Sequence, residues 1–154
     1  KILSFCVALL LCGQTVLAAE PNVAAQGAAL IDGETGRLLW GKNAESPMEM
    51  ASTTKIMTAL LTLEEAAKEN KIVTISEQVA AVEGSSMYLN AGDRLSLKDL
   101  AIGMLTVSGN DAAYGAAVAI GGSEEEFAKL MNARAKELGM EHTQFCDGVR
   151  VRCR

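Results

Sequence analysis

Aromatic residues, histidine and basic patches are all scarce in this sequence, and each shortage limits the kind of core or function that the protein can have. Aromatic residues make up only 4% of the 154 residues, so a core drawn from 49% hydrophobic residues must be mainly aliphatic. The formal net charge is -5 and no basic patch precedes the last few residues, which argues against a nucleic-acid partner. His142 is the single histidine, so no Ser-His-Asp triad is supported.

The N-terminal segment is apolar and contains two of the four cysteines. Lys1 precedes an apolar run that reaches residue 11, and small residues follow at Ala18 and Ala19. A basic residue, an apolar stretch and a small-residue cleavage site, in that order, are typical of a secretory signal peptide, and a buried helix is the alternative. We therefore expect residues 1–19 to be a signal peptide and the mature protein to be secreted or to act in the cell envelope.

The rest of the chain predicts one hairpin followed mostly by helices. Residues 27–40 have two apolar runs around a Gly-containing turn, which is typical of a β-hairpin. Apolar periodicity and glycine stops predict four helices, over residues 53–68, 96–107, 111–120 and 123–138. Capping-box patterns mark two of the helix starts, with Ser96 and Asp99 at one and Ser123 and Glu126 at the other. The first half of the first helix is apolar nearly all round, so we expect it to be buried. Beyond a short extended piece at residues 72–75, no later strand is evident for the hairpin to join.

Ser52 and Lys55 lie three residues apart at the start of the first predicted helix. This separation places both side chains on one helix face. A lysine in a dry setting loses affinity for its proton, and a neutral amine beside a hydroxyl is a base beside a nucleophile. The spacing therefore indicates acyl transfer, although the same pattern also arises by chance where a surface lysine lies one turn into a helix.

Ser108 and Asn110 form a second polar cluster, between two predicted apolar helices. A serine there can pass a proton, and the Asn110 amide can both donate to and accept from a substrate amide. Taken alone, these residues are better explained by ordinary loop and cap chemistry. Asp111, which follows, is interpreted as a first-turn helix-capping residue.

Together the two clusters resemble the motifs of the active-serine penicillin-recognising enzymes, which combine Ser-x-x-Lys, Ser-x-Asn and Lys-Thr-Gly. Residues 28–36, 51–58, 106–113 and 138–145 are also similar to the D-alanyl-D-alanine carboxypeptidases, the low-molecular-mass penicillin-binding proteins. The resemblance implies an α/β fold of the β-lactamase/transpeptidase type, with an antiparallel sheet beside a helical cluster. We expect residues 20–145 to be a partial catalytic domain that holds the hairpin and most of the helices.

The resemblance also implies a role for each matching residue. Ser52 would be the nucleophile, acylated by a peptidoglycan stem peptide that ends in D-Ala-D-Ala, and Lys55 would be the base. Ser108 would relay a proton toward the leaving D-Ala, and Asn110 would hold the substrate amide. Water would release the acyl group without a cofactor or metal, and β-lactam antibiotics would act as covalent inhibitors.

Two other functions fit the same residues. A class A β-lactamase-like hydrolase shares the first two motifs, and fast deacylation of a β-lactam would identify it. A catalytically dead envelope fragment would have a role limited to binding, and a tagged penicillin would leave its Ser52 unlabelled.

No Lys-Thr-Gly motif is present in the sequence. In the family this motif lies on a strand beside the nucleophile, and loss of one oxyanion donor costs about 10²–10³ in rate in other enzymes. We therefore expect the lack of this motif to impair activity.

Residues 146–154 hold three of the six arginines and two of the four cysteines. We hypothesise that residues 146–154 are out-of-frame translation. Sequencing the locus tests this, because the hypothesis requires another frame that encodes the strands with Lys-Thr-Gly.

Overall fold

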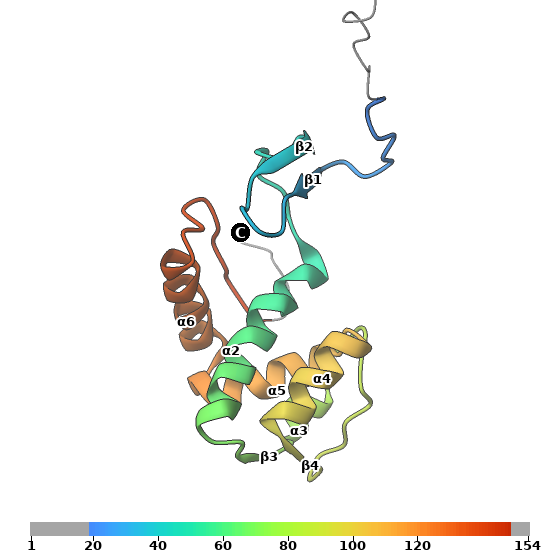
Figure 1. Ribbon diagram of the computed structural model, residues 1–154. Helices are drawn as coiled ribbons and strands as arrows, with labels where there is room; N and C mark the ends of the chain where they lie inside the picture. Colours follow the sequence, from blue (N-terminus) through green and yellow to red (C-terminus); the bar gives the residue numbers. More distant parts are fainter. Residues whose placement is uncertain (1–18, 149–154) are drawn as a thin grey trace, which may run out of the picture. The chain divides into compact units, whose positions relative to one another are not determined.

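The structure, a computed structural model, describes residues 19–148 of the chain (Figure 1). It divides the chain into two compact units, Lys1–Ser46 and Pro47–Arg154. All of the predicted signal peptide except Ala19 lies outside the described residues, as do residues 149–154 of the predicted aberrant tail. In the part of the chain that is described, no helix has the length and apolar character needed to cross a membrane.

The first unit contains a β-hairpin. Strand β1 (Ala28–Ile31) pairs antiparallel with strand β2 (Leu38–Lys42). The Asp32 carboxylate organises the turn, because it accepts hydrogen bonds from the backbone N–H groups of Glu34 and Thr35 and from the Thr35 hydroxyl. The hairpin that the sequence predicts is therefore confirmed.

The second unit is mostly helical. Its elements in chain order are η1 (Ala51–Thr54), α2 (Lys55–Lys68), β3 (Ile72–Thr74), α3 (Glu77–Ala80), β4 (Arg94–Ser96), α4 (Leu97–Thr106), α5 (Asn110–Gly121) and α6 (Glu124–Glu137). The four longer helices confirm the four that the sequence predicts. The short elements α3 and β4 are not predicted, because three or four residues are too few to show a period. Strands β3 and β4 pair antiparallel in a two-stranded sheet of their own.

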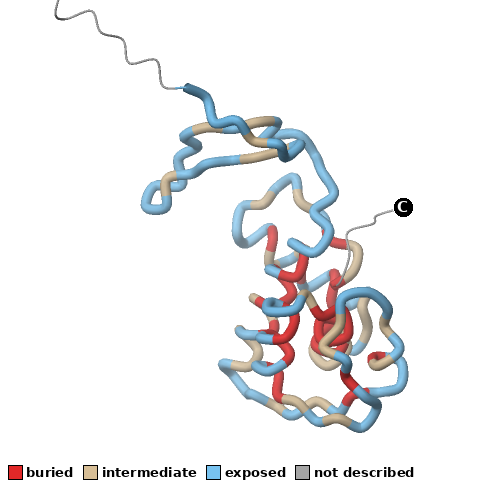
Figure 2. Tube along the Cα trace, turned by 90° about the vertical axis from the view of Figure 1, so that its right-hand side faces the viewer, coloured by how far each residue is buried: buried red, intermediate tan, exposed pale blue. Residues whose placement is uncertain are grey.

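The core lies among the helices of the second unit, where Figure 2 shows the buried residues gathered. Helix α5 contacts α2, α4 and α6 and contributes small side chains to the core. Its alanines at the contacts are fully buried: Ala112, Ala113, Ala116 and Ala117. Small side chains allow neighbouring helices to approach closely, and larger residues such as Leu100, Met131 and Phe127 fill the remaining space.

The prediction that the first half of α2 is buried is confirmed for most of its residues but is wrong for one face of the helix. Met57 and Ala59 are buried, but Ile56 is 65% exposed and Leu63 is 40% exposed. Residues seven apart lie on one helix face. Helix α2 packs against α4, α5 and α6 on its other side, so those neighbours leave the face with Ile56 and Leu63 uncovered within the described residues.

Side chains cap the N-terminal ends of α4 and α6. Ser96 and Asp99 form the capping box that the sequence predicts at the start of α4. At the start of α6, Ser123 accepts the Glu126 N–H, but the Glu126 carboxylate binds Lys129 instead of completing a capping box. The second predicted box is therefore only half formed.

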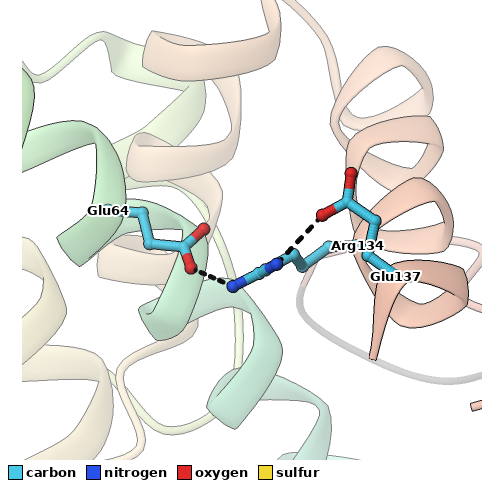
Figure 3. Close-up of polar contacts among 3 residues, drawn as sticks. All are labelled: Glu64, Arg134 and Glu137. Carbon is cyan, nitrogen blue, oxygen red and sulfur yellow. Dashed lines mark hydrogen bonds and ion pairs between the residues drawn. The ribbon is translucent and has the colours of Figure 1, made fainter. Parts of the chain in front are cut away.

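Arg134 connects α6 to α2 (Figure 3). Its guanidinium donates to Glu64 of α2 at 2.6 Å and to Glu137 of its own helix at 2.9 Å. Hydrogen bonds to Glu137 and Glu64 raise the pKa of the Arg134 guanidinium above its ordinary value. This charge-assisted contact holds the C-terminal half of α2 to α6.

The close approach of α5 to the backbone of α6 can be tested at Gly121. A Cβ at Gly121 would lie 2.7 Å from the Phe127 backbone nitrogen. We expect Gly121→Ala to lower the free energy of unfolding by about 1–3 kcal/mol, because the backbone must shift. Helix propensity alone would favour alanine by about 1 kcal/mol, so the two effects have opposite signs.

Chemical denaturation of both proteins measures this difference. Gly33→Ala is the control, because a Cβ there meets nothing within 4 Å. A free energy of unfolding that is unchanged or raised in Gly121→Ala would contradict the close approach.

Candidate active site

The Lys55 amine lies within hydrogen-bond distance of two serine hydroxyls. Its Nζ is 3.3 Å from Ser52 Oγ and 3.2 Å from Ser108 Oγ, and it donates to both. Lys55 is only 2% exposed, whereas Ser52 is exposed and Ser108 is half-buried. The structure thus brings together three of the four predicted site residues, although Lys55 and Ser108 are 53 positions apart in the chain.

Ser52 lies in η1, which leads directly into α2. The chain enters this turn through Ala51, whose φ of +44° is in the left-handed region. That conformation is unfavourable for a residue with a Cβ. The continuous turn places Ser52 one helical turn before Lys55, which is the arrangement predicted from their spacing.

Ser108 lies in the short connection between α4 and α5. Its φ is +56°, again in the left-handed region and again without a glycine. Backbone strain of this kind costs on the order of 1–3 kcal/mol and clusters at functional sites. The surrounding structure must therefore hold the Ser108 backbone in place while its hydroxyl contacts Lys55.

Asn110 begins α5 and is 8% exposed. Its side-chain amide donates to the Glu83 carbonyl and its backbone N–H donates to the Ser85 carbonyl, both at 2.7 Å. One N–H of the amide therefore has a partner in the protein. Because an amide has two N–H groups and a carbonyl oxygen, Asn110 retains groups that can meet a substrate.

Asp111 is 1% exposed, and its partners are different from those that the sequence predicts. Its carboxylate accepts from the Ser86 hydroxyl at 2.7 Å and from the backbone N–H groups of Met87 and Leu89 at 3.0 and 3.1 Å. The interpretation of Asp111 as a helix-capping residue is therefore wrong in its main point, although one oxygen also accepts the Ala112 N–H. No local pattern predicts contacts that join residues more than twenty positions apart.

Burial and hydrogen bonding act in opposite directions on Asp111. Burial alone would raise the pKa of this carboxyl group, but hydrogen bonds from Met87, Ser86, Leu89 and Ala112 outweigh it and hold the pKa below the ordinary value of 3.8. Within residues 19–148, no group of three or more His, Cys, Asp or Glu side chains is arranged to hold a metal ion.

A helical cluster that carries Ser-x-x-Lys beside Ser-x-Asn is the arrangement of the active-serine penicillin-recognising proteins. The profile of the D-alanyl-D-alanine carboxypeptidase family matches residues 14–149, and the chain belongs to this family. It is 44% identical over 126 residues to the D-alanyl-D-alanine carboxypeptidase DacF of Bacillus subtilis, covering 79% of this chain and 32% of that protein.

A second relative gives the same result. The chain is 39% identical to the D-alanyl-D-alanine carboxypeptidase DacC of Escherichia coli, covering 89% of this chain and 38% of that protein. It therefore spans about a third of the length of these relatives.

Among solved structures, DacD from Francisella tularensis matches with a TM-score of 0.81 and 36% identity, covering 88% of this chain and 34% of that one. Penicillin-binding protein D2 from Listeria monocytogenes, in its ampicillin-bound form, matches with a TM-score of 0.73 and 31% identity, over 87% of this chain and 56% of that one. The predicted α/β fold of the β-lactamase/transpeptidase type is confirmed.

The ionisation of Asp111 should appear in the pH dependence of stability. Because the folded-state pKa lies below 3.8, the contribution of the carboxylate is present above pH 3.8 and is lost as the pH falls through the folded-state value. We expect the Tm of the wild-type protein to fall relative to that of Asp111→Asn between about pH 5 and about pH 2. Thermal unfolding at a series of pH values measures this, and a difference that does not change with pH would contradict it.

Proposed function

We propose that the protein is a serine-type D-Ala-D-Ala carboxypeptidase that acts on peptidoglycan stem peptides through an acyl-enzyme on Ser52. The observation that carries this proposal is the Lys55 amine, which lies within 3.3 Å of the Ser52 hydroxyl and 3.2 Å of the Ser108 hydroxyl. A hydroxyl beside an amine that also reaches a second hydroxyl has the parts needed for nucleophilic attack and proton transfer. The 44% identity to a D-alanyl-D-alanine carboxypeptidase supports this substrate class.

Ser52 is the nucleophile in this mechanism. Its Oγ attacks the carbonyl carbon of the penultimate D-Ala while Lys55 Nζ takes the hydroxyl proton. The exposure of Ser52 suits attack on a substrate from solution, and the burial of Lys55 keeps the base in one position. Because the two groups are already 3.3 Å apart, little rearrangement is needed before proton transfer.

Ser108 and Asn110 complete the first half of the reaction. The tetrahedral intermediate collapses as the C–N bond breaks, and the leaving amine of the terminal D-Ala takes a proton from Lys55 through the Ser108 hydroxyl. The contact of 3.2 Å between Lys55 and Ser108 supports this route. The Asn110 amide holds an amide of the substrate with the groups that Glu83 does not engage.

Hydrolysis of the Ser52 ester completes the cycle. Water attacks the acyl carbon and its proton passes to Lys55; the C–O bond to Ser52 then breaks, and Ser52 Oγ takes that proton from Lys55 to leave as the free hydroxyl. A β-lactam would acylate Ser52 in the same way, and the ampicillin-bound form of a relative supports this class of covalent inhibitor. Because peptidoglycan lies outside the cytoplasmic membrane, we place the mature protein there, with residues 1–19 as its signal peptide.

Labelling with a fluorescent penicillin tests the nucleophile. We expect one covalent adduct, located on Ser52 by mass spectrometry and abolished in Ser52→Ala. Thr53→Ala is the matched control, because this exposed hydroxyl is one residue away and donates to the Met50 carbonyl instead. An adduct on another residue, or no adduct on well-folded wild-type protein, would contradict the proposal. Rapid release of the label would instead indicate a β-lactamase-like hydrolase.

The base can be tested in the same assay. We expect Lys55→Ala to lower the rate of acylation by about 10²–10⁴-fold, which is the usual contribution of a positioned general base. Lys68→Ala, at the exposed end of the same helix, removes a lysine that pairs with Glu65 and should leave the rate unchanged. Equal rates for Lys55→Ala and wild-type protein would exclude Lys55 as the base.

A further inference from the structure

Two consecutive residues at the start of α5 hold a single distant segment. Residues 83–89 receive two hydrogen bonds from Asn110, at the carbonyl groups of Glu83 and Ser85. The same segment donates three hydrogen bonds to the Asp111 carboxylate, from Ser86, Met87 and Leu89. Residues 83–89, which we call the anchored segment, therefore contact α5 immediately after the Ser108 turn.

Glycines allow the anchored segment to approach the site closely. Gly84 has a φ of +101°, and a Cβ there would lie 2.5 Å from the Asn110 side-chain nitrogen. On the other side of the segment, Met87 packs onto Gly103 of α4, where a Cβ would lie 1.7 Å from the methionine sulfur. The anchored segment thus contacts both helices that flank Ser108.

The Ser108 backbone needs such support because it is strained. Its left-handed φ of +56° is unfavourable for a residue with a Cβ, and it persists only where the surroundings fix both sides of the turn. Gly109, at the N-cap of α5, provides no side-chain cap. The hydrogen bonds of Asn110 and Asp111 to the anchored segment fix the α5 side of the turn.

We propose that Asp111 is a positioning residue, which holds the anchored segment and thereby fixes Ser108 and Asn110 against Lys55. A capping role would need one acceptor, whereas Asp111 uses both carboxylate oxygens on donors from the anchored segment. An asparagine at this position would keep one acceptor oxygen and would place N–H groups against N–H and O–H donors. The consequence for rate rests on the function proposed above, while the consequence for the geometry of the turn does not.

Asp111→Asn and Asp99→Asn form a matched pair for the test. Both change a carboxylate in the first turn of a helix to the amide of the same size, and Asp99 accepts only from Ser96 of its own capping box. We expect acylation by fluorescent penicillin to slow by about 100-fold in Asp111→Asn, as for a displacement of about 1 Å at a reacting group. The slowing should remain at saturating penicillin, and Asp99→Asn should react at the wild-type rate. Wild-type rates in Asp111→Asn, or equal losses in the two variants, would overturn the proposal.

A second measurement keeps the geometry independent of activity. In ¹H–¹⁵N NMR spectra of the full chain, we expect Asp111→Asn to shift the Asn110 side-chain amide and the Ser108 backbone amide. It should also speed hydrogen exchange at the Met87 and Leu89 N–H groups, and Asp99→Asn should do neither. An unlabelled wild-type protein would defeat the proposed function alone, whereas unchanged Ser108 and Asn110 signals in Asp111→Asn would defeat the positioning role.

Discussion

The arrangement of the second unit depends on a buried amine that needs polar partners. Lys55 is 2% exposed, and a polar group removed from water is costly unless it forms hydrogen bonds. Two of its partners, Ser52 and Ser108, come from segments far apart in the sequence. The start of α2 and the connection between α4 and α5 must therefore lie together, and the small buried alanines of α5 allow the helices to pack closely enough for this contact.

Two residues with strained backbones and one buried carboxylate with several hydrogen bonds lie near this contact. Ala51 and Ser108 both adopt left-handed backbone conformations, one beside each hydroxyl that Lys55 reaches. Asp111, only three residues beyond Ser108, is a buried carboxylate whose hydrogen bonds outweigh its burial and lower its pKa. The two strained backbones are unfavourable, and they persist because the surrounding structure holds them. The same surroundings keep the Ser108 hydroxyl within reach of the amine.

Local features of the structure could be predicted from the sequence, and long-range ones could not. Apolar periods and caps predict the hairpin and the four longer helices, and a separation of three residues predicts the contact of Ser52 with Lys55. The family resemblance gives Ser108 a role in proton relay, but spacing alone does not predict its contact with Lys55, because the two residues are 53 positions apart. The exposure of Ile56 and the partners of Asp111 depend on which elements pack together, and no local pattern contains that information.

A crystal structure of the penicillin-treated protein would show directly whether Lys55 and Ser108 serve an acylated Ser52. We predict an ester between the opened β-lactam and Ser52 Oγ, with Lys55 Nζ still within hydrogen-bond distance of Ser108 Oγ and with Asn110 next to an amide of the adduct. A structure in which the adduct is absent or lies on another residue, or in which the Lys55 amine points away from both serines, would contradict it.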